Sequence, residues 1–333
     1  MGTPLAQNLE LLVYTARMRL RGKQRYPFVL MLEPTERCNV SCDGCGRIRE
    51  YKDLMHVNMS LQQCLGAVEE SGAPVVSLCG GEPTVYPWIS ELVQGILDRR
   101  RWIYLCTNAQ TLTRTLHKYP RSKRLIFNIH LDGMAKTHDA IMNLPGAFDR
   151  AIDALRSAKA RGYRVCTNTT VFKESDPEEI IELCRHVASL GAEALLLSPG
   201  FSYTALQGAD LFLGREQTRQ VFRRIWEGVK DLPLGNTPVY WDFLIGKKEL
   251  ACSAWANPTF NPAGWKGPCY LITDQHHKTF EGLMEDTPWE LYGTGKDPRC
   301  AQCMVHCGYE GAAIIESGKS IRDMWRMFRW SFL

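Results

Sequence analysis

This 333-residue chain lacks long apolar runs, an export signal, repeats and strong net charge, and each absence excludes a class of protein. Without a run of about 18 apolar residues, no segment is expected to span a membrane. The first residues lack a basic stretch followed by an apolar one, so the sequence predicts no secretory signal and a cytoplasmic protein. A net charge of only +4 argues against nucleic-acid binding. The chain has no internal repeat, which argues against a solenoid fold.

Cysteine, in contrast, is plentiful, with 13 residues in the chain. Because disulfides are rare in the reducing cytoplasm, we interpret grouped cysteines as metal ligands. Isolated ones such as Cys64 and Cys184 fall within apolar helical patterns and are expected to be buried small hydrophobic residues. The grouped cysteines are Cys38, Cys42 and Cys45, then Cys252 and Cys269, then Cys300 and Cys303, with Cys307 close behind.

Strand-like apolar runs alternate with helix-like segments six times between residues 27 and 234. The expected strands are 28–33, 74–79, 102–106, 124–131, 163–172 and 192–198. Each is followed by an expected helix, at 60–70, 88–100, 111–118, 147–161, 177–190 and 215–231. Right-handed crossovers then give an α/β fold, a partial (β/α)6 barrel of parallel strands. Ligands of such sheets bind at the carboxyl ends of the strands.

The two ends of the chain differ from this barrel. Residues 1–26 are expected to form an N-terminal helix, because the stretch 4–22 is basic and has helical apolar spacing. We interpret it as a surface helix packed on the domain. The alternative is an interfacial membrane helix, but membrane contact is not expected. From 235 to 333 Trp, Pro and Gly become frequent and the strand–helix rhythm stops, which indicates a small cysteine-rich C-terminal domain.

The first cysteine group lies on one loop after the first strand, with the spacing C-x3-C-x2-C. Its three thiolates can each bind one iron of a 4Fe-4S cubane, which leaves the fourth iron without a cysteine from this loop. Zinc is the alternative, but zinc prefers four ligands and the loop offers no obvious fourth. The loop resembles the signature of the radical S-adenosylmethionine (SAM) superfamily, in which the open iron binds SAM. Many members have an aromatic residue just before the last cysteine, where this chain has Gly44.

The second strand is followed by Gly80-Gly81-Glu82-Pro83, which resembles the superfamily's GGEP motif that contacts the amino group of SAM. By the same resemblance, polar residues at other strand ends hold SAM or substrate, namely Asn108, His130, Asn168 and Ser198. Their alternative roles are caps and turns. Cys106 and Asp132 are candidate catalytic residues. We interpret Cys106 as a hydrogen-atom donor to a substrate radical, with a plain core cysteine as the alternative.

The later cysteines follow C-x11-G-x4-C, through Gly264, and then C-x2-C. This pattern resembles the twitch and SPASM-type C-terminal domains of radical SAM enzymes, which hold an auxiliary 4Fe-4S cluster. The ligands that the resemblance implies are Cys252, Cys269, Cys300 and Cys303, with Cys307 as an alternative. Structural zinc bound by four thiolates is the other interpretation.

Segments 25–34, 71–77, 104–108 and 300–310 resemble the adenosylhopane synthase branch of the superfamily, which is related to sugar- and nucleoside-modifying enzymes of antibiotic pathways. Residues 84–86 and 201–207 depart from that branch, which indicates a changed small-molecule substrate. We therefore expect a deoxyadenosyl radical that abstracts hydrogen from a sugar or nucleoside, followed by decarboxylation or dehydration, with a flavodoxin-type reductant.

Two other functions stay open. The first is addition of the adenosyl radical to an alkene, as in adenosylhopane synthesis. The second is a non-catalytic iron–sulfur scaffold, which the open three-cysteine loop argues against because a passive cluster would be fully ligated. An apolar pocket would favour the alkene, whereas Lys, Arg or Glu side chains reaching the mouth would favour the sugar.

Overall fold

A nine-stranded sheet organises the computed structural model, which describes residues 4–206 and 208–332. Its order is β6-β5-β4-β3-β2-β1-β7-β8-β9, and neighbours from β1 to β6 pair in parallel. These six strands are β1 (Val29–Leu32), β2 (Val75–Leu78), β3 (Trp102–Thr107), β4 (Leu125–His130), β5 (Arg164–Val171) and β6 (Leu195–Pro199). Because β6 does not close onto β1, the sheet is an open partial barrel, as the sequence predicts.

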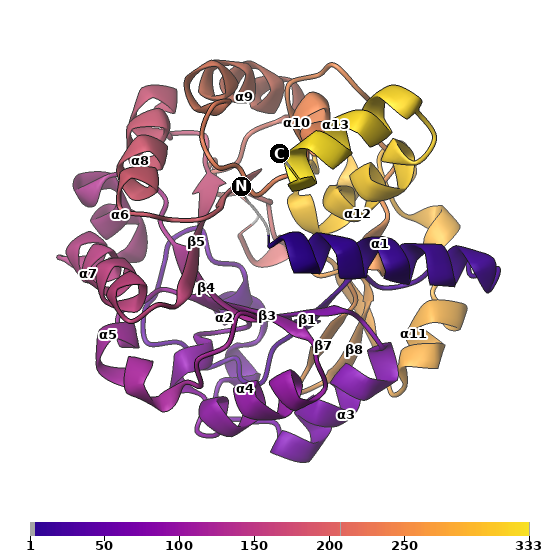
Figure 1. Cartoon of the computed structure of the whole chain (residues 1–333), viewed down its shortest axis with the longest axis horizontal. Helices are drawn as coiled ribbons and strands as arrows, with labels where there is room; N and C mark the ends of the chain where they lie inside the picture. The colour runs from indigo at the N-terminus through magenta and orange to yellow at the C-terminus, as the bar shows by residue number, and fades with distance from the viewer. Residues whose placement is uncertain (1–3, 207, 333) are drawn as a thin grey trace.

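Helices surround the parallel strands on their outer side (Figure 1). They are α3 (Leu61–Ser71), α4 (Ile89–Asp98), α5 (Leu112–Thr115), α6 (Ala135–Met142), α7 (Ala147–Ala160), α8 (Pro177–Ser189) and α9 (Arg215–Val229). Local chemistry sets their ends. Ser60 and Gln63 form a capping box at the start of α3, and Asp176 caps α8 ahead of its first-turn proline. The expected strands and helices of the barrel are thus confirmed to within a few residues.

Side chains of the parallel strands alternate between the hydrophobic core on one side of the sheet and the barrel interior on the other. Leu30, Val76, Leu105 and Phe127 are fully buried in the core between sheet and helices. The next residue of each strand points to the opposite side of the sheet, where the barrel interior lies. Those residues are Met31, Ser77, Cys106 and Asn128, three of them polar or thiol side chains.

Three further strands continue the sheet beyond residue 235, namely β7 (Thr259–Asn261), β8 (Gly264–Pro268) and β9 (Thr273–His277). β7 pairs in parallel with β1, and β8 and β9 add antiparallel strands. The sequence analysis places no strand here, because these are only three to five residues long and β9 is polar throughout. The sheet therefore crosses the expected domain boundary, whose position stays a prediction.

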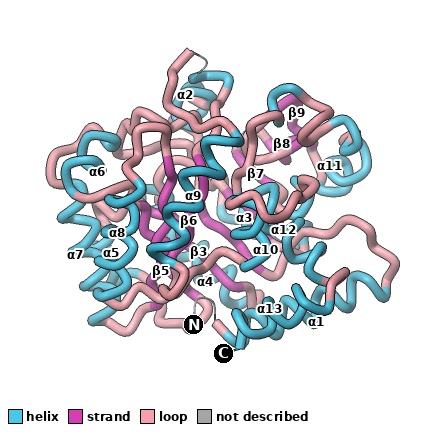
Figure 2. Tube along the Cα trace, turned by 90° about the horizontal axis from the view of Figure 1, so that it is seen from above, coloured by secondary structure: helices cyan, strands magenta, loops and turns pink. Residues whose placement is uncertain are grey.

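The remaining helices lie at the two ends of the barrel and along one side of it (Figure 2). They are α1 (Leu5–Leu20), α2 (Arg47–Glu50), α10 (Pro238–Leu244), α11 (Phe280–Asp286), α12 (His306–Ser317) and α13 (Ile321–Phe332). α2 follows the cysteine loop at the carboxyl ends of the strands. α1 and α13 lie together at the opposite end, where the Asn8 side chain donates to the Ser331 carbonyl at 3.4 Å. No helix in the described part of the chain is long and apolar enough to cross a membrane.

Candidate active site

A cavity of about 810 Å³ occupies the barrel interior, from the cysteine loop down to α1 and α13. It brings together most of the residues singled out in the sequence. Those that line it are Cys38, Cys42, Cys45, Gly80, Gly81, Glu82, Cys106, Asn108, His130, Asp132, Asn168 and Ser198. Pro83 is not among the lining residues and begins a short 3-10 helix, Pro83–Val85. The five C-terminal cysteines do not line the cavity either.

The first cysteine loop presents three half-buried thiols to this cavity. The Arg49 guanidinium donates to the carbonyls of Cys42 and Cys45, at 3.0 and 2.6 Å, and so fixes the loop. Burial, reinforced by neighbouring thiols and carboxylates, raises the pKa of Cys38 to about 12 and also raises that of Cys42. Such thiols become thiolates only when a cationic metal centre offsets this cost.

The donor set of this loop fits a cubane. Within the described residues, no three His, Cys, Asp or Glu side chains converge as ligands of a single metal ion would. A cubane does not need such convergence, because each thiolate binds a different iron. Three thiols on one loop, facing an open cavity, suit a cluster whose fourth iron takes a small-molecule ligand.

Gly80 and Gly81 are required by the close approach of the cysteine loop. Gly80 has φ +104, and a Cβ there would lie 2.6 Å from the Thr35 carbonyl oxygen. A Cβ on Gly81 would lie 2.2 Å from the carbonyl oxygen of Arg37. The Gly81 N–H donates to Thr35 at 3.0 Å and the Glu82 N–H donates to Arg37 at 2.8 Å. The turn after β2 and the cysteine loop therefore hold each other in place.

The Glu82 side chain stabilises this turn. Its buried carboxylate accepts hydrogen bonds from the Thr84 and Thr107 hydroxyls, at 2.6 and 2.7 Å, and from the Asn108 N–H at 2.8 Å. Burial raises the pKa of Glu82, while these donors act in the opposite direction. The carboxylate links the ends of β2 and β3, so this side chain positions the site.

Aromatic rings lie where Gly44 and Gly46 leave room beside Cys45. A Cβ on Gly44 would lie 2.5 Å from the ring of Phe172, which also lines the cavity. A Cβ on Gly46 would lie 2.1 Å from the ring of Tyr203. The aromatic residue that the superfamily pattern has at position 44 is absent, and a ring from the end of β5 takes up that space. The sequence analysis missed this, because Phe172 lies 128 positions away along the chain.

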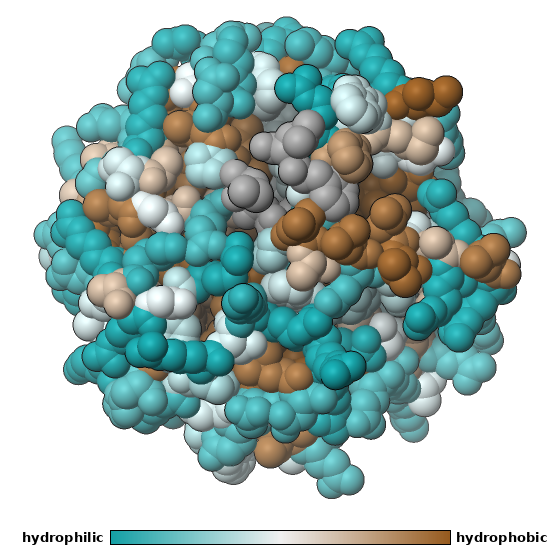
Figure 3. All heavy atoms as spheres, viewed as in Figure 1, coloured by the Kyte–Doolittle hydropathy of each residue, from teal (hydrophilic) through white to brown (hydrophobic). Residues whose placement is uncertain are grey.

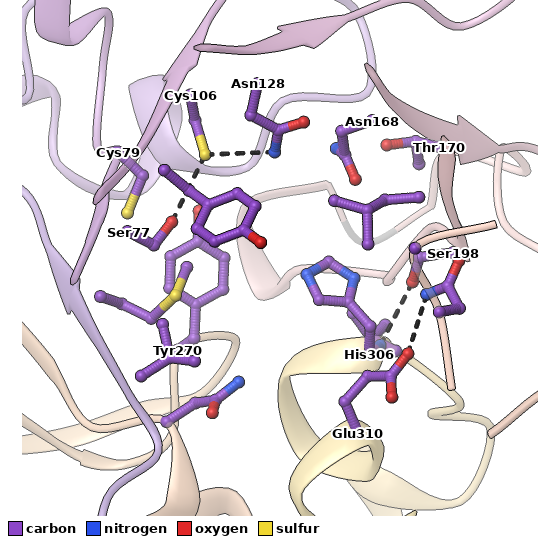
Figure 4. Close-up of a pocket in the computed structure, with 18 of the residues that line it drawn as sticks. Ser77, Cys79, Cys106, Asn128, Asn168, Thr170, Ser198, Tyr270, His306 and Glu310 are labelled. Carbon is purple, nitrogen blue, oxygen red and sulfur yellow. Dashed lines mark hydrogen bonds between the residues drawn. The ribbon is translucent and has the colours of Figure 1, made fainter. Parts of the chain in front are cut away.

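Cys106 points from β3 into the cavity (Figure 4). Its sulfur lies 3.4 Å from the Ser77 hydroxyl and accepts a hydrogen bond from the Asn128 amide at 3.5 Å. Burial raises the pKa of this thiol, and the two polar neighbours only partly oppose that effect. Cys106 therefore keeps its S–H bond, as a hydrogen-atom donor must.

Asp132 is held in a buried network at the end of β4. It accepts from the Thr170 N–H at 2.7 Å and pairs with His130 Nε2 at 2.6 Å. Burial acts to lower the pKa of His130, but the Asp132 carboxylate outweighs it and the pKa is raised. Behind them, burial lowers the pKa of His138 to about 4, and its neutral Nδ1 accepts the Asp132 N–H at 3.1 Å. The cavity wall thus carries a paired His130 and Asp132.

A second polar group of the cavity wall joins Ser198, expected from the sequence, to His306 and Glu310, which were not expected. The His306 N–H donates to the Ser198 hydroxyl at 3.3 Å, and Glu310 accepts from the Thr237 hydroxyl at 2.7 Å and from Asn236 at 3.0 Å (Figure 4). Burial raises the pKa of Glu310 to about 7. His306 and Glu310 are four residues apart on α12, so both face the cavity. Their i, i+4 spacing is visible in the sequence, but it predicts a shared face only where a helix is expected, and no helix is expected there.

The C-terminal cysteines form a separate group beside the cavity. Cys252, Cys269, Cys300 and Cys303 are half-buried, Cys307 is buried, and all five thiols are close enough to interact electrostatically. Burial, with the neighbouring thiols adding to it, raises the pKa of Cys303 to about 12. Tyr203 interacts with both Cys45 and Cys307, so its ring lies near both cysteine groups. Five thiols exceed the four that one cluster or zinc needs.

Comparisons with known proteins agree with this geometry. Residues 32–187 match the radical SAM superfamily, and residues 195–327 match a domain of unknown function, DUF3463. The Fe-coproporphyrin III synthase of Methanosarcina barkeri is 25% identical over 61% of this chain and 54% of its own length. The AdoMet-dependent heme synthase of the same organism is 29% identical over 50% of this chain and 49% of its own. The GTP 3',8-cyclase of Campylobacter fetus is 26% identical over 49% and 53%.

These curated relatives are matched over only about half of their own length. Solved structures share the fold more widely. SuiB of Streptococcus suis, bound to its precursor peptide SuiA, aligns with a TM-score of 0.66 and 17% identity over 96% of this chain and 79% of its own. The enzyme anSMEcpe with bound AdoMet aligns with a TM-score of 0.60 and 13% identity over 92% and 97%. With the cysteine loop and the GGEP turn both inside the matched segment, residues 32–187 form a radical SAM superfamily domain.

Proposed function

We propose that this radical SAM enzyme adds the deoxyadenosyl group of SAM to a carbon–carbon double bond of an apolar substrate. The observation that carries the proposal is the composition of the cavity's far end. Apolar side chains from α1, α12, α13 and the segment before β1 line it, namely Leu11, Leu12, Phe28, Ile314, Met324, Met327 and Phe328. An apolar wall of this kind favours contact with a hydrocarbon over contact with a sugar.

Arg19 of α1 and Glu310 of α12 are charged residues that line this part of the cavity, while other charged side chains gather near the cysteine loop. Arg47 is buried against Glu33 and Glu36, and Glu82 is committed to its own hydrogen bonds, all near the cysteine loop. These groups anchor the loop and are not directed to the apolar end. The charged mouth expected for a sugar substrate is therefore supported less well than the apolar pocket of the alkene route.

The residues have distinct proposed roles. Cys38, Cys42 and Cys45 would hold the 4Fe-4S cluster, and the backbone at Gly80 and Gly81 would bind the amino group of SAM. Bound together, the cluster and SAM supply a deoxyadenosyl radical. The substrate carbon left with an unpaired electron after addition needs a hydrogen atom, and the Cys106 S–H bond provides one. The resulting thiyl radical then takes one electron and one proton, for which a flavodoxin-type donor is the expected source.

Hydrogen abstraction from a sugar or nucleoside is the second candidate. The polar group of Ser198, His306 and Glu310 favours it, since hydroxyl-rich ligands need such partners. One relative, the GTP 3',8-cyclase, bears the name of an enzyme acting on a nucleotide. Other relatives are named for porphyrin chemistry, so their names select no one substrate class for this chain.

We further propose that the C-terminal cysteines hold a second 4Fe-4S cluster, with zinc as the alternative. Their separation from the cavity supports a role in electron supply or structure rather than in binding substrate. A loop-rich segment of short strands gains stability from any metal that cross-links it.

The test is anaerobic reconstitution with iron and sulfide, followed by SAM, a strong reductant and an apolar isoprenoid with a terminal methylene. Mass spectrometry is expected to find substrate increased by the deoxyadenosyl group, with free 5′-deoxyadenosine as a minor product. Release of free 5′-deoxyadenosine with a nucleoside substrate, and no adduct with any alkene, would overturn the proposal in favour of hydrogen abstraction. Cys38→Ala is the control, because it removes the cluster and should abolish both products.

A further inference from the structure

α1 is apolar on two sides, which is unusual for a helix on the surface of a globular protein. One side packs on the body of the protein, where Leu11, Tyr14 and Met18 contact Tyr26 and Phe28. The other side is open to solvent. Its exposed fractions are 48% for Leu5, 46% for Leu9, 62% for Leu12, 56% for Val13 and 89% for Leu20. These positions repeat with helical spacing and form one stripe along the helix.

α13 presents a matching stripe. Ile321, Met324, Trp325 and Phe328 are spaced i, i+3, i+4, i+7, and their exposed fractions run from 44% to 83%. The rings of Trp325 and Phe328 stack, with centroids 5.4 Å apart. Nine of the eleven large hydrophobic side chains that are exposed in the described residues therefore belong to these two helices. Figure 3 shows apolar side chains gathered over this region of the surface.

The two stripes form one surface, which we call the α1/α13 surface. The helices contact each other through Asn8 and Ser331, and a Cβ on Gly318, just before α13, would lie 3.0 Å from the Arg19 guanidinium. Leu12 and Phe328 belong both to this surface and to the lining of the cavity. The apolar end of the cavity therefore lies beside the α1/α13 surface.

Basic side chains border the surface without partners. Among the described residues, no ion pair is formed by seven exposed basic side chains, namely Arg17, Arg19, Arg21, Lys23, Arg25, Arg322 and Arg329. The acidic residues of α1 and α13 are already neutralised, since Glu10 pairs with Arg124 and Asp323 pairs with Lys248. The surface is thus apolar at its centre and positively charged around it.

We propose that the α1/α13 surface docks on an anionic lipid bilayer. Exposed leucines and aromatic rings insert at the boundary of headgroups and acyl chains, and arginines pair with anionic headgroups. A second copy of the chain is a poorer occupant, because a two-fold interface would bring the same unpaired basic residues face to face. Membrane contact is not expected from the sequence, because the sequence alone does not show that α1 packs on the protein body through a different apolar face.

Docking also suggests how an apolar substrate reaches the cavity, and this inference rests on the proposed function. The bilayer would cover the apolar end of the cavity, so an apolar substrate could pass from the lipid phase into the barrel without crossing water. The cysteine loop, at the other end of the barrel, would stay exposed to an electron donor. The docking itself needs neither SAM nor substrate and is tested without turnover.

The experiment is sedimentation of the reconstituted full chain with two kinds of vesicle. One contains phosphatidylcholine alone, and in the other about one lipid in three is the anionic phosphatidylglycerol. We expect binding to the anionic vesicles that weakens as salt rises, and little binding to phosphatidylcholine. The apolar variant Leu9→Gln/Val13→Gln/Trp325→Gln should abolish binding. The basic variant Arg17→Gln/Arg21→Gln/Arg322→Gln should lower the partition coefficient by about fivefold for each residue removed.

The matched control is Trp88→Gln/Leu291→Gln, which removes two large exposed hydrophobic side chains that lie outside the surface. It should bind vesicles like the unmodified chain. All substituted side chains are exposed, so folding is checked by circular dichroism and iron content. Failure of the unmodified chain to sediment with anionic vesicles would overturn the proposal. So would a dimer, seen by light scattering, that dissociates in the apolar variant, since the surface would then join two copies. Vesicle binding without any alkene adduct would keep the docking and refute only the proposed reaction.

Discussion

The carbonyl oxygen of Arg37 lies 2.2 Å from where a Cβ on Gly81 would stand, so the cysteine loop and the GGEP turn have room for each other only because residue 81 is glycine. Both partners are backbone, and neither can move without displacing the hydrogen bond from Glu82 N–H to Arg37. The GGEP turn therefore fixes the loop that carries Cys38, Cys42 and Cys45.

Gly81→Ala should push the cysteine loop out of position. Under the two-cluster proposal, we expect the iron content to fall from about eight to about four per chain, because only the cluster of the first cysteine loop would be lost. Iron analysis and absorbance after reconstitution measure this. Gly66→Ala, in α3 with nothing within 4 Å of its Cβ, is the matched control and should keep full iron with unchanged or higher stability. Full iron in Gly81→Ala would show that the loop tolerates the displacement.

Phe172 should contribute to SAM binding in place of the missing aromatic residue at position 44. Phe172→Ala is expected to weaken SAM binding by about two- to tenfold, the worth of one aromatic contact, at unchanged iron content. Gly44→Phe alone should clash with the Phe172 ring, whereas Gly44→Phe/Phe172→Gly should bind SAM better than either single variant. Equilibrium dialysis with labelled SAM decides this. Additive losses in the double variant would mean that the two positions do not share one space.

Cys106→Ala should leave SAM cleavage intact and change the product, because only the quenching hydrogen atom is lost. We expect reduced saturated adduct and an increase in oxidised or rearranged species in the mass spectrum. Cys184→Ala, a buried cysteine of α8, is the control and should give the normal product. An unchanged product in Cys106→Ala would return this residue to a packing role.

The C-terminal cysteines should differ in their effect on the second cluster. Cys303→Ser is expected to remove about four irons per chain, whereas Cys307→Ser should keep them, since Cys307 is the alternative ligand. Iron and zinc are counted in the same samples. Loss of iron in Cys307→Ser with retention in Cys303→Ser would reverse the assignment. One zinc and about four irons in the unmodified chain would replace the second cluster by a zinc site.

His138 should make folding stability depend on acidity. Burial lowers its pKa to about 4 in the folded protein, against about 6.5 in the unfolded chain. Between these values the unfolded chain binds more protons, so the free energy of unfolding falls as the pH drops, by about 1.4 kcal/mol per pH unit from this group. Urea unfolding of the reduced apoprotein between about pH 6.5 and 5, the upper part of that window, measures the slope. His138→Gln should flatten it, and an equal slope in both proteins would contradict the assignment.

The sequence by itself determined the barrel and the chemistry of its open end. Apolar runs of strand length alternate with amphipathic helices, and this pattern is compatible with few other folds. Because side chains alternate along each strand, Cys106 and its neighbours face the barrel interior. The spacing of Cys38, Cys42 and Cys45 also needs no tertiary information, because all three ligands lie on one short loop.

Only the tertiary structure decided which distant residues complete the site. Phe172 fills the space beside Gly44, and Glu310 reaches the cavity from a helix near the end of the chain, because folding brings together segments that no local pattern connects. The apolar stripe of α1 is likewise ambiguous in sequence, where a face that packs and a face that stays exposed have the same periodicity. Which face the protein body covers depends on long-range packing, and that packing leaves Leu12 and Val13 exposed.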